Sequence, residues 1–478
     1  MLTIVLIHNE NERVTNVNDD LNLYFDQKVM QKYNTAGPRY TSYPTAVAFE
    51  ALENNTLLMR SLTKLAQSED ATKLSLYMHI PFCHSLCYYC GCNKIVTRHK
   101  DKADIYLDYL IKEIELQAKH ANACSVDSLH LGGGTPSFLN KAQLTRLISA
   151  ARSAFHFNAD IEMSIEIDPR EILITYIDEL AEIGFNRLSI GVQDIDSKVQ
   201  ESINRLQSTQ FVRDIIQRAR KLKFRSVNVD LIYGLPHQTP LSFQKTLDEM
   251  SIMDPDRISL FSYAHMPQLF AAQRKIKDAW LPNSDDKFAL FRQAIGSLTK
   301  QGYAFIGMDH FAKPEDELSK AREEKRLFRN FQGYTTSKAH ATLGLGVSSI
   351  SSIGNTYVQN HKKLKDYYSA IDSKKSATIK GVELSKDDEI RRALIHALMC
   401  NFNVNKDSFG KQFDIDFDTY FAKSLNSLAP FVEDKLVTNS AQAIVIHERG
   451  RLIVRNVCMS FDEYLDQPLH QMRYSRVI

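Results

Sequence analysis

The sequence predicts an α/β protein in which parallel strands form a wide, incomplete β/α barrel, followed by a mainly helical C-terminal domain. Three observations lead to this fold class. Strand-like runs alternate with amphipathic helical patterns, the strands have one polar face, and helical patterns take over near residue 383. With 478 residues, of which 44% are hydrophobic and 24% charged, the chain has enough apolar material for a large core.

Six short runs rich in β-branched residues occupy the first part of the chain. They span 74–80, 126–132, 162–168, 187–193, 226–234 and 257–265. Amphipathic helical patterns lie between them, for example at 103–120 and 210–224, and Thr239 followed by Pro240 is typical of a helix start. Because strands and helices alternate, we expect parallel β/α units with right-handed crossovers.

One face of these strands is apolar and the other is polar. The polar positions are Ser75, Tyr77, His79, Ser164, Glu166, Asp168, Asn228 and Asp230. Because helices must cover the apolar face, we expect the polar side chains to point into the barrel. A closed eight-stranded barrel fills its interior with branched apolar side chains, so a polar interior predicts an incomplete barrel that holds polar ligands. Edge strands that face solvent are the alternative.

Beyond about residue 270 the β/α alternation weakens. The stretch 313–327 predicts a charged helix with a solvated face, and 344–354 is rich in small residues that could bring the backbone close to a ligand or another element. Helical patterns follow at 385–402 and 416–436, and then a short two-stranded ribbon. This arrangement resembles a winged-helix module. It lacks the basic stripe that DNA binding requires, so we interpret it as a lid or buttress.

Charge and hydropathy narrow the partners and the location of the chain. The formal net charge is only +2, which gives no reason to expect nucleic acid or a membrane surface as a partner. No window approaches the roughly 20 apolar residues of a transmembrane helix, and the short apolar run at the N-terminus lacks the basic residue that precedes it in a signal peptide. Cys124, Cys400 and Cys458 lie far apart, as single buried thiols do. We therefore expect a reducing, cytoplasmic setting, in which clustered cysteines more often bind metal or catalyse than form disulfides.

Four of the seven cysteines lie within ten positions, directly after the first predicted strand. Cys83, Cys87 and Cys90 form a C-x3-C-x2-C pattern where parallel β/α folds carry active-site loops. Inert thiols are one alternative. A structural zinc site that adds Cys92 or His84 is another, although zinc modules usually take ligands from two separated knuckles. An iron–sulfur cluster fits better, and three thiolates from one loop would leave one iron open to a substrate or cosubstrate.

A C-x3-C-x2-C loop with an aromatic residue before its third cysteine resembles the radical S-adenosylmethionine (SAM) superfamily. The sequence LGGGTPSFL at 131–139 agrees, because its glycines allow the backbone to approach an amino-acid ligand. A closer resemblance, from about residue 30 to the C-terminus, is to the bacterial oxygen-independent coproporphyrinogen III oxidases. It is carried by the runs 32–46, 79–95, 164–172, 185–194, 228–239, 270–279, 307–314 and 329–336.

The resemblance implies a fold, a reaction and a set of cofactors. The family's fold resembles an incomplete barrel of the radical SAM type, followed by a helical C-terminal domain. Its reaction converts two propionates of coproporphyrinogen III to vinyl groups, giving protoporphyrinogen IX for haem synthesis, by 5′-deoxyadenosyl radical abstraction of propionate β-hydrogens. The resemblance implies a [4Fe–4S] cluster, two SAM molecules per chain, a flavodoxin or ferredoxin as reductant, and a monomer that binds neither nucleic acid nor membrane.

The family's site residues can be placed on this sequence one at a time. Cys83, Cys87 and Cys90 match the cluster ligands, and Cys92 matches a fourth cysteine that is not a ligand but is tied to activity. The positions that match contacts to the cluster-bound SAM are Tyr77, Gly133, Glu166 and Ile350. The positions that match contacts to the second SAM are Tyr89, Gly134, Thr135, Gln193, Arg205, Asp230 and Ala264.

The resemblance also divides the chain into four parts. Residues 1–29 are an N-terminal extension without an assigned function, 30–73 a segment over the active site, 74–380 the barrel with its extension, and 381–478 the helical, winged-helix-like domain. In the second part, Arg39 is a candidate partner for a substrate propionate. From its position alone, Arg205 would be interpreted as an exposed helix arginine, and only the match assigns it to SAM.

Two functions from other classes remain as alternatives. A haem-carrying chaperone of the same superfamily would share the barrel and the cluster. Such relatives lack the fourth cysteine and the N-terminal GPRYTSYP segment, and both are present here. A zinc-stabilised nucleic-acid binder would use the C-terminal module, and the near-neutral charge argues against it.

Overall fold

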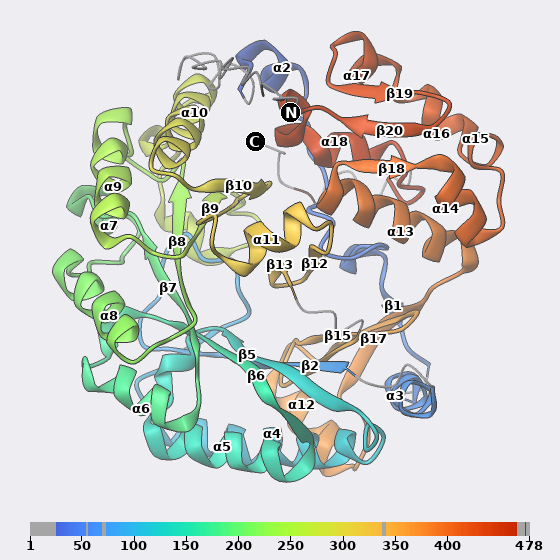
Figure 1. Cartoon of the computed structure of the whole chain (residues 1–478). Coiled ribbons are helices and arrows are strands. Elements are labelled where there is room, and N and C mark those ends of the chain that lie inside the picture. The colour runs from blue at the N-terminus through green and yellow to red at the C-terminus, as the bar shows by residue number, and fades with distance from the viewer. Residues whose placement is uncertain (1–24, 54–55, 69–72, 337–340, 466–473, 475–478) are drawn as a thin grey trace, which may run out of the picture.

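The computed structural model describes residues 25–53, 56–68, 73–336, 341–465 and 474, so most of the predicted N-terminal extension lies outside the described residues. The core is a 13-stranded sheet with the strand order β1-β17-β16-β15-β14-β2-β5-β6-β7-β8-β9-β11-β10. The sheet curves strongly, helices follow its outer side, and the C-terminal region, coloured red, lies on the opposite side of the molecule from α8 (Figure 1).

The six predicted strands form the parallel centre of this sheet. They are β2 (Lys73–Ile80), β5 (Ser125–Gly133), β6 (His156–Ile167), β7 (Arg187–Gln193), β8 (Ser226–Tyr233) and β9 (Arg257–Ser262). Each pairs in parallel with the next. The prediction of parallel β/α units is therefore confirmed.

Helices connect these strands and cover their apolar face (Figure 1). They are α4 (Asp101–Ala118), α5 (Lys141–Ala154), α6 (Thr175–Ile183), α7 (Ser197–Ser202), α8 (Thr209–Lys221), α9 (Pro240–Met253) and α10 (Ser284–Lys300). The predicted helix start is confirmed, because Thr239 and Ser242 form a reciprocal capping box at the first turn of α9. Within the described part of the chain, no helix is both long enough and apolar enough to span a bilayer.

The inner face of the parallel strands is polar, as the alternation predicts. Nδ1 of His130 on β5 lies 2.6 Å from the hydroxyl of Ser164 on β6. Further along the sheet, the Asn228 amide of β8 donates to the Ser189 hydroxyl of β7 at 2.9 Å. These bonds join neighbouring strands in the middle of the sheet, so the alternative of solvent-facing edge strands is wrong.

Mainly antiparallel strands, all but one of them from later in the chain, extend both edges of the sheet. On one side are β14 (Ala341–Leu345), β15 (Ile350–Ile353), β16 (Thr356–Asn360), β17 (Thr378–Glu383) and β1 (Glu50–Ala51), and on the other are β11 (His310–Ala312) and β10 (Ala304–Gly307). Of these, β14 runs parallel to β2. The small-residue stretch 344–354 turns from β14 into β15, and a Cβ at Gly344 would collide with the backbone of Ile350. Close packing of the two strands therefore requires that glycine.

The segment between β11 and β14 contains short elements, and a further helix, α12 (Leu364–Asp372), lies between β16 and β17. The short elements are α11 (Glu317–Glu323) and the antiparallel hairpin of β12 (Phe328–Asn330) and β13 (Gly333–Thr335). The helix predicted at 313–327 is shorter than expected, and it is not only a solvated face, because Leu318 and Ala321 are buried. Those two apolar residues anchor α11 to the core.

The C-terminal region contains short helices and a small sheet. The helices are α13 (Lys386–Asn401), α14 (Lys406–Phe413), α15 (Phe417–Tyr420), α16 (Ala422–Asn426), α17 (Ala429–Glu433) and α18 (Val454–Met459), and the strands are β18 (Asn403–Asn405), β19 (Val437–Asn439) and β20 (Ala443–Ile446). The ribbon β19–β20 is confirmed, with β18 as a third strand. The helical pattern at 416–436 breaks into three pieces, and Pro430 lies in the first turn of α17, where proline is tolerated.

The N-terminal segment packs against the C-terminal region. Its helices are α2 (Gln27–Lys32) and α3 (Leu57–Gln67). The Tyr33 ring stacks on Phe431 with a centroid distance of 4.7 Å. The Asn456 amide donates to the Tyr33 carbonyl at 2.9 Å, and Nε of Arg455 donates to the Pro38 carbonyl at 2.8 Å. Segments more than 400 positions apart are therefore joined by direct hydrogen bonds.

Candidate active site

The cysteine loop follows β2 and is tied down at several points. It begins with β3 (Phe82–Cys83), which pairs with β4 (Ile95–Val96) at the end of the loop. In between, the Tyr88 amide donates to the Ile203 carbonyl at 2.9 Å, and the Gln273 amide donates to the Tyr89 carbonyl at 2.9 Å. The loop thus has a fixed shape at the carboxyl end of the parallel strands, where the sequence predicts an active site.

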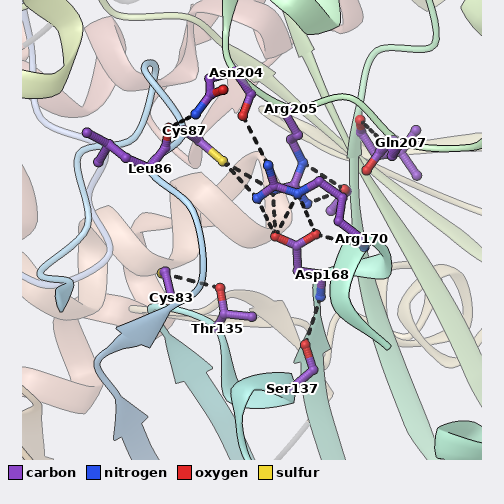
Figure 2. A network of polar contacts seen from close by, with 12 residues as sticks. Cys83, Leu86, Cys87, Thr135, Ser137, Asp168, Arg170, Asn204, Arg205 and Gln207 are labelled. Atoms are coloured by element: carbon purple, nitrogen blue, oxygen red, sulfur yellow. Dashed lines mark hydrogen bonds and ion pairs between the residues drawn. The ribbon is translucent and has the colours of Figure 1, made fainter. Parts of the chain in front are cut away.

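Two of the predicted cluster ligands receive hydrogen bonds at sulfur. Cys83 and Cys87 are buried. The Thr135 hydroxyl donates to Cys83 Sγ at 3.3 Å. Arg170 Nη2 and Arg205 Nη1 donate to Cys87 Sγ at 3.3 and 3.4 Å. Figure 2 shows both guanidinium groups between the sulfur and the loop after β6. Donors of this kind stabilise thiolate sulfur and tune a bound cluster.

Asp168 holds the two arginines in place. Its Oδ2 accepts from Arg170 Nη2 at 2.6 Å and from Arg205 Nη1 at 3.1 Å (Figure 2). Burial alone would raise the pKa of Asp168, but the Arg205 and Arg170 guanidinium groups hold it at about 2. Arg205 is only 5% exposed, so the interpretation of it as an exposed helix arginine is wrong.

The third and fourth cysteines of the loop interact with each other. The hydrogen bond from Cys92, together with the nearby Lys94 ammonium, lowers the pKa of Cys90 to about 6 despite burial. The same hydrogen bond raises the pKa of Cys92 well above its ordinary value. Lys94 Nζ also donates to the Cys90 carbonyl at 3.0 Å. Cys90 is therefore the more easily ionised of this pair, as a metal ligand must be, whereas Cys92 is a neutral thiol that lines a cavity.

The glycine run at the end of β5 is shaped by the cysteine loop and by β2. Gly133 has a positive φ of 114°, and a Cβ there would collide with the His79 ring. A Cβ at Gly134 would lie 2.7 Å from the Pro81 carbonyl group, and the Gly134 amide donates to the Ile80 carbonyl at 2.8 Å. Only residues without a side chain fit so close to the cysteine loop.

A cavity of about 1570 Å³ opens beside the cysteine loop. It exceeds the several hundred Å³ of a typical small-molecule site, so it has room for two sizeable ligands. The residues predicted for the cluster-bound SAM all line it, together with Cys92, and they are Tyr77, Gly133, Glu166 and Ile350. Glu166 Oε2 accepts from the Gly133 amide at 3.3 Å, and the Tyr77 ring stacks on His130 at 5.9 Å. The structure therefore brings this predicted set together.

The residues predicted for the second SAM are more dispersed. They lie in the cysteine loop (Tyr89), after β5 (Gly134, Thr135), at a bulge in β7 (Gln193), after α7 (Arg205), on β8 (Asp230) and after β9 (Ala264). The Gln273 amide joins two of them, because it donates to the carbonyls of Tyr89 and Ala264. Ala264 and Arg39 line a smaller pocket of about 360 Å³, and Arg39 pairs with Asp309 at 3.5 Å.

Asp230 is a buried carboxyl group on the inner face of β8. Burial and the neighbouring Glu166 raise its pKa to about 6, although it accepts hydrogen bonds from Asn228 and Ser189. An acid in this environment gains from a cationic partner, and the sulfonium of SAM is one.

The donor set fits a cluster. Among the described residues, no three Cys, His, Asp or Glu side chains converge on a single-ion position. A [4Fe–4S] cluster does not need such convergence, because each thiolate binds a different iron. Cys83, Cys87 and Cys90 come from one fixed loop, and hydrogen-bond donors already point at two of the sulfurs. The residues present therefore fit this cofactor.

Some site residues cannot be recognised from the sequence. Arg170 lies in the run 164–172 and Gln273 in the run 270–279, and nothing local distinguishes them from solvated polar residues. His79 is predictable only as a polar strand position. Its Nε2 lies 3.0 Å from the Asn93 carbonyl, which ties β2 to the cysteine loop.

Comparison with known proteins agrees with this geometry. The radical SAM superfamily matches residues 77–250, and the HemN C-terminal domain matches residues 384–453. The oxygen-independent coproporphyrinogen III oxidases of Salmonella typhimurium and Escherichia coli are each 50% identical over 454 residues, 95% of this chain and 98% of those proteins. The chain belongs to the oxygen-independent coproporphyrinogen III oxidase family, within the radical SAM superfamily.

Relatives in this family extend to greater sequence distance and include a solved structure. The Pseudomonas aeruginosa member is 44% identical over 458 residues, 95% of this chain and 99% of that protein. The structure described as coproporphyrinogen III oxidase (HemN) from Escherichia coli, a radical SAM enzyme, superimposes with a TM-score of 0.88 at 48% identity. The superposition covers 93% of this chain and 100% of the Escherichia coli chain. The predicted incomplete radical SAM barrel is thereby confirmed.

Proposed function

We infer that this chain converts coproporphyrinogen III to protoporphyrinogen IX without oxygen, as a radical SAM enzyme of haem biosynthesis. Relatives that are 50% identical to this chain over nearly their whole length are named for this activity. The observation that carries the inference is the position of the cysteine loop beside a cavity of about 1570 Å³. Cys92 of the loop lines this cavity together with Gly133 and Glu166. The substrate's two reacting propionates would have to reach this end of the cavity.

The cluster and SAM, when bound, supply one-electron radical chemistry at an unactivated C–H bond, which acid–base side chains cannot supply. Cys83, Cys87 and Cys90 would hold the cluster and leave one iron for SAM. Glu166, whose Oε2 already accepts from the Gly133 amide, would accept from the ammonium or ribose of that SAM. The Gly133 backbone, bare of a side chain, would let the amino-acid part of SAM approach.

We further propose that the remaining matched residues bind a second SAM. They are Tyr89, Gly134, Thr135, Gln193, Arg205, Asp230 and Ala264. The buried Asp230 carboxyl supports the proposal, because a nearby sulfonium or ribose would satisfy it. The guanidinium nitrogens of Arg205 already donate to protein acceptors. Arg205 would therefore have to share its N–H groups between Cys87, Asp168 and this ligand.

Other parts of the proposal concern partners and location. We propose a flavodoxin or ferredoxin as electron donor, a monomeric state, and a cytoplasmic location. Support for the location comes from the cysteines, because all seven are free thiols. The four-part division of the chain remains a proposal, in which the segment 30–73 and the C-terminal domain together enclose the substrate. Residues from both of them, such as Tyr43 and His396, line the cavity.

The direct test is anaerobic. The full chain is reconstituted with iron and sulfide and incubated with SAM, a reductant and coproporphyrinogen III. We expect protoporphyrinogen IX, detected by chromatography as protoporphyrin after oxidation, together with 5′-deoxyadenosine in matching amount. A porphyrin or haem that binds but is not converted, with the cluster intact, would favour a haem-carrying chaperone instead.

A further inference from the structure

An arginine on the hairpin β12–β13 lines the cavity, and two of its buried guanidinium nitrogens lack an acceptor in the described part of the chain. Arg329 is in β12 opposite Tyr334 in β13 and lines the same cavity as Cys92 and Glu166. Its Nε and Nη1 atoms are buried and have no hydrogen-bond partner among the residues that the structure describes. A buried donor without a partner costs about 1–3 kcal/mol, and more when it is charged. The cavity is therefore built for an acceptor at this point.

The position of the guanidinium is fixed by an aromatic ring. The Arg329 guanidinium carbon lies 4.7 Å from the centre of the Tyr334 ring. The Tyr334 hydroxyl donates to the Met399 carbonyl on α13 at 2.9 Å, which holds the ring. The ring leaves the polar edge of Arg329 available while supporting its face, an arrangement that favours recognition of a carboxylate.

The surroundings of Arg329 carry an excess of positive charge. A carboxylate that interacts with Arg329 is Asp309, which accepts from His310 Nδ1 at 2.8 Å and pairs with Arg39 at 3.5 Å. Although buried, Asp309 has a pKa held well below its usual range by His310, Arg329 and Arg39. Burial, with Arg39 and Arg329 nearby, also lowers the pKa of the Arg455 guanidinium to about 9. Three guanidinium groups thus share one carboxylate, and an added anion would balance them.

We propose that Arg329 binds a propionate carboxylate of the tetrapyrrole through the N–H groups that lack a protein acceptor. The inference rests on the proposed function, because coproporphyrinogen III is the anionic ligand with four such groups. Phe328, Phe409 and Phe413 line the same cavity and offer apolar surface to the macrocycle. One ionic contact at Arg329 would set the rotation of the macrocycle relative to Cys92 and the cysteine loop.

The test measures binding of stable porphyrins to the full, cluster-loaded chain by fluorescence quenching. The probes are coproporphyrin III, which has four carboxylates, and its tetramethyl ester, which has none. We expect Arg329→Gln to weaken coproporphyrin III binding about 10- to 100-fold, the equivalent of one charge-assisted hydrogen-bond site, and to leave ester binding unchanged. Arg329→Lys should fall between, because it keeps the charge without the planar guanidinium.

A matched control removes an arginine outside the cavity. Arg326 is three positions away, is exposed, and pairs with Glu324. Arg326→Gln should leave binding of both probes unchanged. Equal affinity of wild type and Arg329→Gln for coproporphyrin III would overturn the inference. So would an equal loss for acid and ester, which would mean that the variant has only disturbed the cavity.

Two further readouts separate this inference from the proposed function and from a role toward SAM. Reductive SAM cleavage without substrate should be unchanged in Arg329→Gln, and a parallel loss of SAM affinity would assign Arg329 to the SAM carboxylate instead and overturn the inference. In turnover, KM for coproporphyrinogen III should rise about 10-fold or more. If the wild-type enzyme is active and Arg329→Gln has the same KM, the inference about Arg329 is overturned and the proposed function stands. If the wild-type enzyme makes no protoporphyrinogen IX, the proposed function is overturned.

Discussion

At the scale of single residues, the chemistry of the site depends on the different surroundings of four neighbouring cysteines. Cys83 and Cys87 are buried with donors at sulfur, and Cys90 has a lowered pKa. Cys92 is instead an exposed thiol with a raised pKa that lines the cavity. Burial raises the pKa of Cys83 to about 11, so this thiol would ionise only when it binds a metal. Two cysteines with donors at sulfur, one with a lowered pKa and one neutral thiol in the cavity are consistent with three ligands and one residue that acts on substrate or radical.

This difference predicts two classes of cysteine variant. Cys83→Ser, Cys87→Ser and Cys90→Ser should each lose the cluster and SAM cleavage, because serine is a poor iron ligand. Cys92→Ser should keep the cluster but lose vinyl formation. Iron and sulfide per chain and 5′-deoxyadenosine are measured for each variant. Loss of iron in Cys92→Ser would make Cys92 a ligand and remove the open coordination site.

A second residue-scale prediction concerns Asp230, whose pKa is raised to about 6 by burial and Glu166. Because the folded chain binds this proton more tightly than the unfolded chain does, the free energy of unfolding falls as pH rises from about 4 to 6 and stays lower above. Asp230→Asn removes that loss, which is about 2–3 kcal/mol at neutral pH.

Thermal unfolding without SAM should therefore give a higher Tm for Asp230→Asn than for wild type at pH 7.5, with little difference at pH 4. The exposed Asp248, replaced by Asn, serves as the control. An identical difference in Tm at both pH values would show that the effect of the substitution does not come from ionisation of Asp230.

At the scale of elements, the strand ends decide where ligands can bind. The parallel strands β2, β5 and β6 end at the cysteine loop, the glycine run and Asp168, so segments with no similarity to one another meet at one edge. At Gly134 a Cβ would lie 2.7 Å from the backbone of Pro81 at the start of the cysteine loop. Backbone cannot move aside as the end of a flexible side chain can.

Gly134→Ala is accordingly expected to push β5 away from the cysteine loop, to destabilise the fold by about 1–3 kcal/mol and to abolish SAM cleavage. Gly302→Ala is the matched control. Gly302 has a positive φ of 91°, but a Cβ there meets nothing within 4 Å, so a cost of about 1 kcal/mol with full SAM cleavage is expected. Unimpaired SAM cleavage in Gly134→Ala would mean that the glycine run is not under this constraint.

At the scale of the whole molecule, the N-terminal and C-terminal regions are fastened to each other near the cavity. Arg455 on α18 donates to the carbonyls of Gly37 and Pro38, and Tyr33 stacks on Phe431. Just beyond these contacts, Tyr40 and Tyr43 line the cavity. The position of the segment over the cavity therefore depends on the C-terminal domain.

Replacing Arg455 with methionine should loosen that segment without disturbing the barrel. Amide hydrogen exchange in residues 33–44 should rise about tenfold, the equivalent of about 1.4 kcal/mol of lost hydrogen bonding, while exchange in β5 and β6 stays unchanged. Arg455→Lys keeps the charge but loses the fork, and an intermediate effect is expected. Unchanged exchange in residues 33–44 would mean that other contacts hold the segment.

The parallel strands, their polar face and the cysteine loop can be predicted from the amino-acid sequence alone. Each of these depends on local spacing: a repeat of two along a strand, and C-x3-C-x2-C within eight positions. The resemblance then named the cavity residues, and the structure places Tyr77, Gly133, Glu166 and Ile350 around one cavity.

The groups that surround the sulfurs, and the buried Nε and Nη1 of Arg329 that lack an acceptor among the described residues, become apparent only in the folded molecule. Arg205 and Cys87 are 118 positions apart, and their contact depends on how the loop after α7 packs on the cysteine loop. The parallel pairing of β14 with β2 spans an even longer separation. Local periodicity carries no information about such contacts, because they arise when hydrophobic burial folds the sheet and brings the strand ends together. The unpaired Nε and Nη1 groups of Arg329 can likewise be recognised only in the folded chain, where the cavity forms around them.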